Sequence, residues 1–211
     1  MFNRQGEWDY FWAAVMFYTR IPVPSSASFS DQILNQSRKY FPLIGLFVGS
    51  FACLVLLITH KFLPLSVCIG LSIVVTILLT GSFHEDGFAD CCDGFGGGWD
   101  KAQVLSIMKD SRVGTYAVVG LVLLIGLKAL SLYEIGLLSL PLLLITYING
   151  HALSRFGASL CIECLDYVQD IDKSKVKPIT LNRLPMRSLI YSGFFIAPTF
   201  LILLHFKLIF I

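Results

Sequence analysis

The chain has 211 residues, of which 55% are hydrophobic and only 14% are charged. A soluble domain of ordinary composition carries about 25% charged residues, so this composition argues against one and indicates an integral membrane protein. The net charge of +2 comes without a clustered basic patch, and we therefore expect no nucleic-acid partner.

The N-terminal region predicts a helix that lies in the membrane interface. Residues 7–20 are rich in tryptophan, tyrosine and phenylalanine, and they end at Ile21-Pro22-Val23-Pro24. This stretch is shorter than the roughly 20 residues that a spanning helix needs, and Trp and Tyr favour the headgroup level. A linker that contains several serines follows the two prolines.

Five long apolar stretches follow, and they cover about residues 41–60, 63–83, 113–133, 135–154 and 189–210. We therefore predict an all-α polytopic membrane protein, with about five transmembrane helices plus the N-terminal interfacial helix. We expect one membrane domain over residues 1–211. With these spans, all lysines and arginines except Lys61, Lys128 and Lys207 fall on one side of the membrane. The positive-inside rule makes that side cytoplasmic.

An acidic run, His84-Glu85-Asp86-Gly87-Phe88-Ala89-Asp90-Cys91-Cys92-Asp93, directly follows the second apolar stretch. If it continues the preceding helix, Asp86, Asp90 and Asp93 have the spacing i, i+4 and i+7 and share one helical face. Like charges this close repel one another unless a cation compensates them, and oxygen-only ligands suit Mg²⁺. The sequence therefore predicts a Mg²⁺ site at the cytoplasmic boundary, against the alternative of solvated helix caps.

Two further elements suit a phosphorylated ligand. The glycines Gly96-Gly97-Gly98 predict a flexible loop whose backbone N–H groups approach the ligand. Before the third apolar stretch, Lys109 and Arg112 supply positive charge for phosphate and Ser111 supplies a hydroxyl group. Carboxylates, a glycine loop and cations together are the groups that a metal-bound pyrophosphate requires.

The sequence leaves the roles of two charged residues open. Asp110 is either a further metal ligand or a partner that orients Arg112. Arg155 ends an apolar stretch, where it either binds the ligand or extends its side chain to the membrane surface.

The acidic run and the later Ile107-Met108-Lys109-Asp110-Ser111-Arg112-Val113-Gly114 together resemble the cobalamin-5′-phosphate synthase family, also called adenosylcobinamide-GDP ribazoletransferases. Three more motifs resemble this family: Thr19-Arg20-Ile21-Pro22, Phe41-Pro42-Leu43-Ile44-Gly45 and Ser154-Arg155. Family members continue into a further hydrophobic stretch and a glycine motif containing Thr-Gly-Asp. This chain includes neither, so we expect it to lack the family's C-terminal segment.

The resemblance implies a Mg²⁺-dependent, multi-pass transferase of the bacterial inner (cytoplasmic) membrane, whose active site faces the cytoplasm. Its donor is adenosylcobinamide-GDP and its acceptor is α-ribazole or α-ribazole 5′-phosphate. The products are adenosylcobalamin or its 5′-phosphate, and GMP. The partners implied are these small molecules, membrane lipid and a second copy of the chain in a homo-oligomer.

This reaction gives each candidate residue an expected role. The expected metal ligands are Asp86, Asp90, Asp93 and Asp110. The expected catalytic residues are Asp93, Asp90 and Arg112. One of the three aspartates of the acidic run either binds metal or instead accepts the hydroxyl proton, and Asp93, nearest the glycines, is the favoured candidate for that base. The expected substrate-binding residues are Lys109, Ser111, Arg112, Gly96, Gly97, Gly98 and Arg155.

Two other functions compete with this interpretation. A CDP-alcohol phosphotransferase of phospholipid synthesis also uses spaced aspartates, but Asp90 stands where that pattern has arginine. A small cation transporter would place its charges near the bilayer midplane, whereas this chain concentrates them at one boundary.

Overall fold

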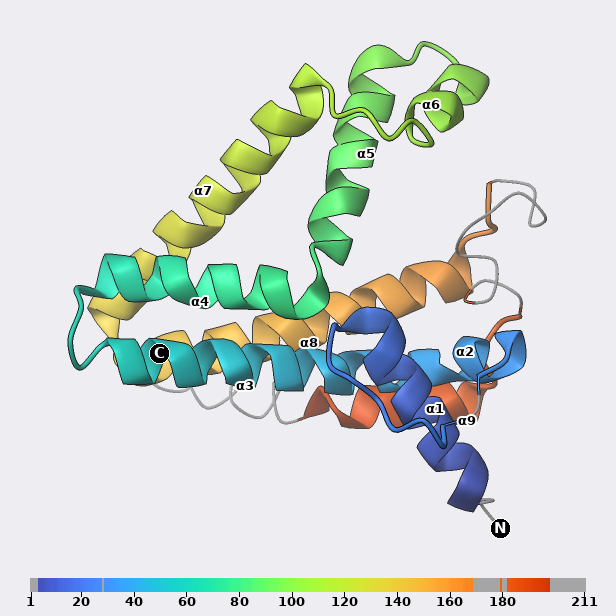
Figure 1. Ribbon diagram of the computed structural model, residues 1–211, viewed down its shortest axis with the longest axis horizontal. Helices are drawn as coiled ribbons and strands as arrows, with labels where there is room; N and C mark the ends of the chain where they lie inside the picture. Colours follow the sequence, from blue (N-terminus) through green and yellow to red (C-terminus); the bar gives the residue numbers. More distant parts are fainter. Residues whose placement is uncertain (1–3, 28, 169–178, 180–181, 198–211) are drawn as a thin grey trace, which may run out of the picture. The chain divides into compact units, whose positions relative to one another are not determined.

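The computed structural model describes residues 4–27, 29–168, 179 and 182–197, and within them it contains helices and no strand. This confirms the predicted all-α fold. Along the chain (Figure 1) the elements are α1 (Arg4–Tyr18), α2 (Asp31–Ser37), η1 (Arg38–Tyr40), α3 (Phe41–Thr59), α4 (Leu65–Thr80), α5 (Phe83–Gly97), α6 (Lys101–Ile107), α7 (Thr115–Leu138), α8 (Leu140–Cys164) and α9 (Met186–Phe194). The chain divides into two compact units: residues 1–53 with 144–211, and residues 54–143.

Two helical stretches among the described residues are long and apolar enough to cross a membrane: residues 31–59 and α7. A third is added if α4 and α5, which form a bent pair, are counted as one span. The predicted number of about five spans is therefore not confirmed. Polar residues, Arg155 among them, interrupt α8, which does not meet the same criterion. The predicted span 189–210 lies largely outside the described residues, which include only its beginning in α9.

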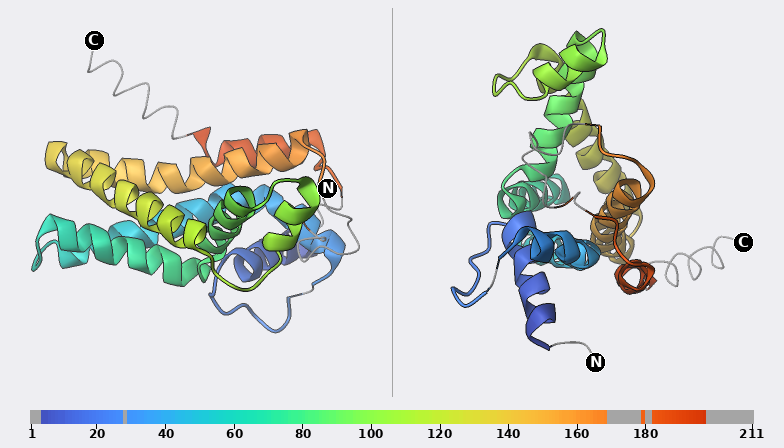
Figure 2. Two further views of the ribbon diagram at one scale, coloured as in Figure 1. Left: turned by 90° about the horizontal axis from the view of Figure 1, so that it is seen from above. Right: turned by 90° about the vertical axis from the view of Figure 1, so that its right-hand side faces the viewer.

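In the first unit, close backbone contact joins α3 to α8. Gly45 and Gly49 lie one turn apart on α3, and a methyl group on either would overlap the α8 backbone at His151 or Ile148. Small residues at this spacing let membrane helices approach closely. Elsewhere in the unit, α1 packs on α2 and η1, and α9 lies alongside α8 (Figure 2). The helix predicted over residues 7–20 is confirmed as α1.

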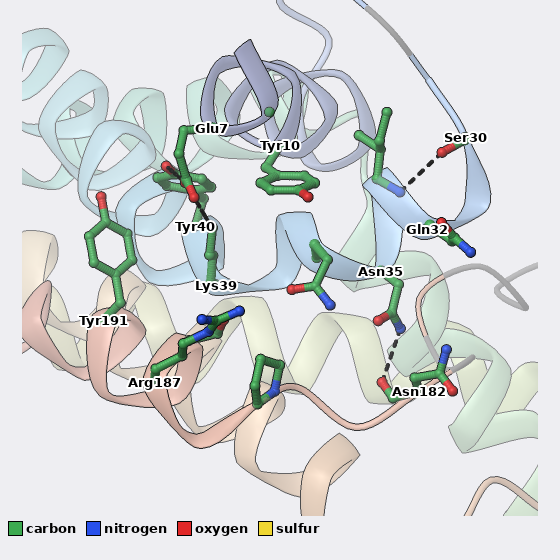
Figure 3. A pocket seen from close by; sticks show the side chains of 15 residues that line it. Glu7, Tyr10, Ser30, Gln32, Asn35, Lys39, Tyr40, Asn182, Arg187 and Tyr191 are labelled. Atoms are coloured by element: carbon green, nitrogen blue, oxygen red, sulfur yellow. Dashed lines mark hydrogen bonds and ion pairs between the residues drawn. The ribbon is translucent and has the colours of Figure 1, made fainter. Parts of the chain in front are cut away.

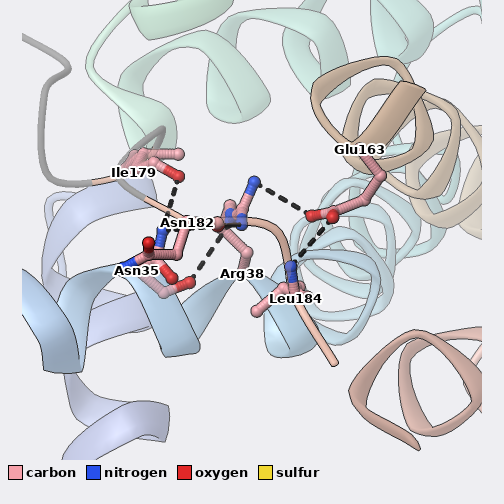
Figure 4. A network of polar contacts seen from close by, with 6 residues as sticks. All are labelled: Asn35, Arg38, Glu163, Ile179, Asn182 and Leu184. Atoms are coloured by element: carbon pink, nitrogen blue, oxygen red, sulfur yellow. Dashed lines mark hydrogen bonds and ion pairs between the residues drawn. The ribbon is translucent and has the colours of Figure 1, made fainter. Parts of the chain in front are cut away.

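A buried ion pair connects three chain segments of this unit (Figure 4). Arg38 Nη1 lies 3.1 Å from Glu163 Oε1, and the two side chains are only 1% and 8% exposed. The other oxygen of Glu163 accepts a hydrogen bond of 2.8 Å from the Leu184 backbone N–H. Arg38 Nη2 donates to the carbonyl oxygen of Asn182 at 2.6 Å. Asn35 Nδ2 donates to the same carbonyl at 3.1 Å, so this network links the start of the α2–α3 stretch to α8 and to the segment before α9.

In the second unit, a sharp turn separates α4 from α5. Gly81 and Ser82 both have left-handed backbone angles, with φ of 65° and 60°. The N–H groups of Ser82 and Gly81 bond back to the carbonyls of Ile77 and Leu78, a Schellman arrangement that ends α4. The two helices meet at 90° (Figure 1). The acidic run is therefore helical, but it does not continue the preceding helix.

Candidate functional site

The acidic run forms α5, the helix that carries Asp86, Asp90 and Asp93. Because residues 83–97 are continuously helical, the spacing i, i+4 and i+7 places these three residues on one face, as predicted. Asp86 is exposed, while Asp90 and Asp93 are half-buried. This face of α5 is the candidate site.

The carboxylate of Asp93 caps the N-terminus of α7. Its Oδ2 accepts a hydrogen bond of 2.6 Å from the Gly114 N–H, and its Oδ1 accepts one of 2.9 Å from the Ala117 N–H. A helix leaves its first N–H groups unpaired, and the cap residue Gly114 has no side chain that could bind them. Asp93 supplies that missing cap from α5, and so joins α5 directly to the segment that precedes α7.

The predicted metal ligands are not assembled around a common point. Among the described residues, no three His, Cys, Asp or Glu side chains are arranged to hold a metal ion. Asp86 and Asp90 remain one helical turn apart on α5, whereas the Asp93 carboxylate is directed at α7 and Asp110 is bound to Arg112. The roles of these four residues as metal ligands therefore stay predictions.

The structure favours one of the two roles considered for Asp110. Its carboxylate accepts hydrogen bonds from Arg112 Nε at 3.0 Å and from Arg112 Nη2 at 2.6 Å. The Arg112 guanidinium lowers the pKa of the Asp110 carboxyl to about 2, so this group is ionised at any neutral pH. Asp110 thus orients Arg112. Lys109 and Ser111 lie exposed on the same segment.

The prediction of a flexible loop at Gly96-Gly97-Gly98 is wrong for two of the three glycines. Gly96 and Gly97 belong to the last turn of α5, and the N–H of Gly98 bonds to the carbonyl oxygen of Gly94 at 2.9 Å. Packing explains why glycine is needed here. A methyl group on Gly96 would overlap the Tyr116 ring, and one on Gly98 would lie 2.6 Å from a Val104 methyl carbon. A nucleotide contact of Gly96, Gly97 and Gly98 therefore stays a prediction.

Arg155 lies in the other unit, on α8, so the candidate residues are divided between the two units. Its side chain is buried, with 4% of the residue exposed. Its Nη1 donates to the His151 carbonyl oxygen at 3.0 Å, and its guanidinium carbon lies 5.7 Å from the centre of the Phe41 ring. Arg155 is therefore held inside the protein and does not extend to the membrane surface. Substrate binding by Arg155 stays a prediction.

Gly114 is named in the sequence analysis only as the last residue of a family motif, with no role in the site assigned to it. A Cβ atom there would lie 2.5 Å from Asp93 Oδ1. The only local signal is a residue without a capping side chain directly before the apolar residues of α7. That signal does not identify the partner, because Asp93 lies 21 residues earlier in the chain.

Replacing Gly114 with alanine is expected to lower both stability and turnover, because the added methyl group displaces the Asp93 carboxylate. The backbone φ of −91° suits alanine, so the effect comes from this collision alone. Loss of a helix cap costs about 1 kcal/mol. Gly126→Ala in α7 is the matched control, since nothing lies within 4 Å of its added methyl group. Thermal unfolding and turnover are measured together, and a Gly114→Ala variant indistinguishable from the wild type would contradict the capping role.

The fold and this site describe an all-helical membrane protein with a carboxylate-bearing helix bonded to a basic segment. The family model described as cobalamin-5-phosphate synthase matches residues 10–211. The relative from Shewanella woodyi is 46% identical over 173 residues, 82% of this chain and 67% of the relative. The relative from Leptothrix cholodnii is 43% identical over 169 residues, 80% of this chain and 64% of the relative. The relative from Leptospira interrogans is 41% identical over 191 residues, 90% of this chain and 72% of the relative.

All three relatives are named adenosylcobinamide-GDP ribazoletransferase. The chain belongs to the cobalamin-5-phosphate synthase family. It spans about two thirds of the length of these relatives. No solved structure matches it. Family membership favours the transferase over the phospholipid phosphotransferase and the cation transporter.

Proposed function

We propose that this chain transfers the cobinamide-phosphate group of adenosylcobinamide-GDP to α-ribazole or its 5′-phosphate, which gives adenosylcobalamin or its 5′-phosphate and releases GMP. The relatives' names and the family support this reaction. The observation that carries the proposal is the hydrogen bond that the Gly114 N–H donates to the Asp93 carboxylate. Gly114 lies only two residues after Arg112 in the chain. This bond fixes the basic segment, suited to phosphate, at the helix that carries the carboxylates.

The donor chemistry of α5 suits Mg²⁺. This ion commonly binds through one or two carboxylates and completes its shell with water and substrate phosphate. We assign Asp86 and Asp90 as its ligands, because they share one face of α5 and Asp86 is exposed. Bound Mg²⁺ would neutralise charge on the donor pyrophosphate. Asp93 and Asp110 then act as positioning residues, one for α7 and one for Arg112.

The residues of the basic segment bind the donor and stabilise the leaving group. Lys109, Ser111 and Arg112 hold the pyrophosphate oxygens, and the positive charges of Lys109 and Arg112 stabilise the departing GMP. The new bond joins the acceptor hydroxyl oxygen to the phosphorus that carries cobinamide. The bond that breaks joins this phosphorus to the oxygen that leaves with GMP. The hydroxyl proton passes to an aspartate carboxylate of α5.

Turnover by the purified chain in lipid tests this function. Adenosylcobinamide-GDP, α-ribazole 5′-phosphate and Mg²⁺ are supplied, and GMP and the corrinoid product are followed. We expect both products to form together, to stop when EDTA removes the metal and to return when Mg²⁺ is added. The same assay with CDP-diacylglycerol is expected to give no product. Because the relatives are longer, a chain extended by their remaining segment is assayed in parallel. If neither chain forms product, the proposal is refuted.

We also propose that the chain is a multi-pass protein of the bacterial inner membrane with this site facing the cytoplasm. With the five predicted spans, the excess of basic residues on the side that carries Lys109 and Arg112 supports this orientation. A cysteine introduced at exposed Ala102, with the native cysteines replaced, is expected to react with an impermeant maleimide in inverted vesicles. Reaction in intact spheroplasts would place the site on the opposite side.

A further inference from the structure

A large cavity lies within the first unit (Figure 3). Its volume is about 1010 Å³, at the upper end of the range of roughly 300–1,000 Å³ typical of small-molecule sites. Residues of α1, α2, η1, α9 and the segment before α9 form its walls. It therefore has the size required for a nucleotide.

Lys39 organises one wall of this cavity. It is only 5% exposed, and its Nζ lies 2.6 Å and 2.8 Å from the two carboxylate oxygens of Glu7. The same nitrogen lies 4.6 Å from the ring centre of Tyr10 and 5.8 Å from that of Tyr191. The charge of Lys39 is therefore compensated, and its contacts hold both aromatic rings at the cavity wall.

Arg187 brings a positive charge that no described residue compensates. It is exposed at the start of α9, lines the cavity and has no hydrogen bond or ion pair within the described part of the chain. Figure 3 shows Arg187 among the residues that line the cavity, together with Lys39 and Tyr191. Since Glu7 balances only Lys39, the cavity carries one excess positive charge from these groups and favours an anion.

The aromatic residues favour a flat ligand. Tyr191 is 41% exposed and Tyr10 is half-buried, so both rings are accessible at the cavity. Rings of this kind stack on a heterocyclic base, and an arginine binds a phosphate through two parallel hydrogen bonds. The amide side chains of Gln32 and Gln36 add hydrogen-bonding groups to the same cavity.

We propose that this cavity binds a phosphorylated aromatic nucleoside, with its base against Tyr10 and Tyr191 and its phosphate on Arg187. The identity of the ligand rests on the proposed function, under which it is the acceptor α-ribazole 5′-phosphate. Anionic lipid headgroups also carry a phosphate that Arg187 could bind. The lipid composition is therefore varied in the test.

Binding of α-ribazole 5′-phosphate is measured by calorimetry on the chain in nanodiscs, without the cobinamide donor. Arg187→Gln is expected to weaken this binding at least tenfold but to change binding of unphosphorylated α-ribazole by less than threefold. Tyr191→Leu is expected to weaken both. Arg183→Gln is the matched control, because Arg183 is exposed, pairs with Asp166 and does not line the cavity. Binding by the control is expected to equal that of the wild type.

The lipid arm compares nanodiscs of phosphatidylcholine with nanodiscs that contain phosphatidylglycerol. Equal nucleotide affinity in both supports the proposal, whereas displacement of the nucleotide by phosphatidylglycerol assigns Arg187 to lipid and overturns it. Turnover is measured on the same samples. If the Arg187→Gln variant is active and binds the nucleotide with wild-type affinity, the cavity assignment is overturned. The proposed function is then unaffected. Absence of both binding and turnover in the wild type and in the extended chain overturns both proposals.

Discussion

Replacing Asp90 with asparagine is expected to lower turnover by at least about 10²-fold while the helical fold is retained. Asp90 lies half-buried on α5, and asparagine keeps its size while removing the negative charge. An amide oxygen binds Mg²⁺ more weakly than a carboxylate, so the Mg²⁺ concentration for half-maximal turnover should rise. GMP release measures the turnover, and circular dichroism checks the helical content.

The matched control for this experiment is Glu134→Gln, which makes the same chemical change at an exposed position on α7. It is expected to keep wild-type turnover. Asp86→Asn should show a loss similar to that of Asp90→Asn, because both residues are assigned to the same ion. Wild-type turnover with unchanged Mg²⁺ dependence in Asp90→Asn would exclude that residue as a ligand.

The largest effect on stability is expected from Glu163→Gln. This change leaves the Arg38 guanidinium buried at 1% exposure without the carboxylate that compensates its charge. Removing one member of a buried ion pair costs about 3–5 kcal/mol. The free energy of unfolding in mixed micelles, titrated with SDS, measures the loss.

Two comparisons separate this effect from a general sensitivity of the first unit. Asp166→Asn breaks the exposed pair with Arg183 and is expected to cost less than about 1 kcal/mol. The double variant Arg38→Met with Glu163→Leu removes both charges, and it is expected to recover much of the stability lost in Glu163→Gln. Equal stability of Glu163→Gln and the wild type would show that the ion pair is unimportant for the fold.

The helical periodicity of the chain could be predicted because it is a local property. The composition and the long apolar stretches indicated an all-helical membrane protein, and α1, α3 and α7 lie close to their predicted ranges. The spacing of Asp86, Asp90 and Asp93 predicted a shared helical face, which α5 confirms. The turn at Gly81 and Ser82 was not predicted, since neither residue distinguishes a bend from a continuous helix within an apolar pattern.

Tertiary contacts decide whether the glycine run forms a loop or part of a helix. Consecutive glycines are typical of loops because they cost a helix conformational entropy. In this protein the Tyr116 ring lies so close to Gly96 that a side chain there would overlap it. The sequence shows the glycines but not the ring 20 residues later that requires them.

The sequence by itself determined the class of protein, the helices, the carboxylate spacing and the family motifs, because each depends on residues within a few turns of one another. Only the tertiary structure decided that Asp93 caps α7, that Glu163 compensates Arg38, and that Lys39 holds two tyrosines at a cavity wall. These partners lie far apart along the chain. Charge and hydrogen bonding select them only after helix packing has brought them within about 3 Å to 6 Å of one another.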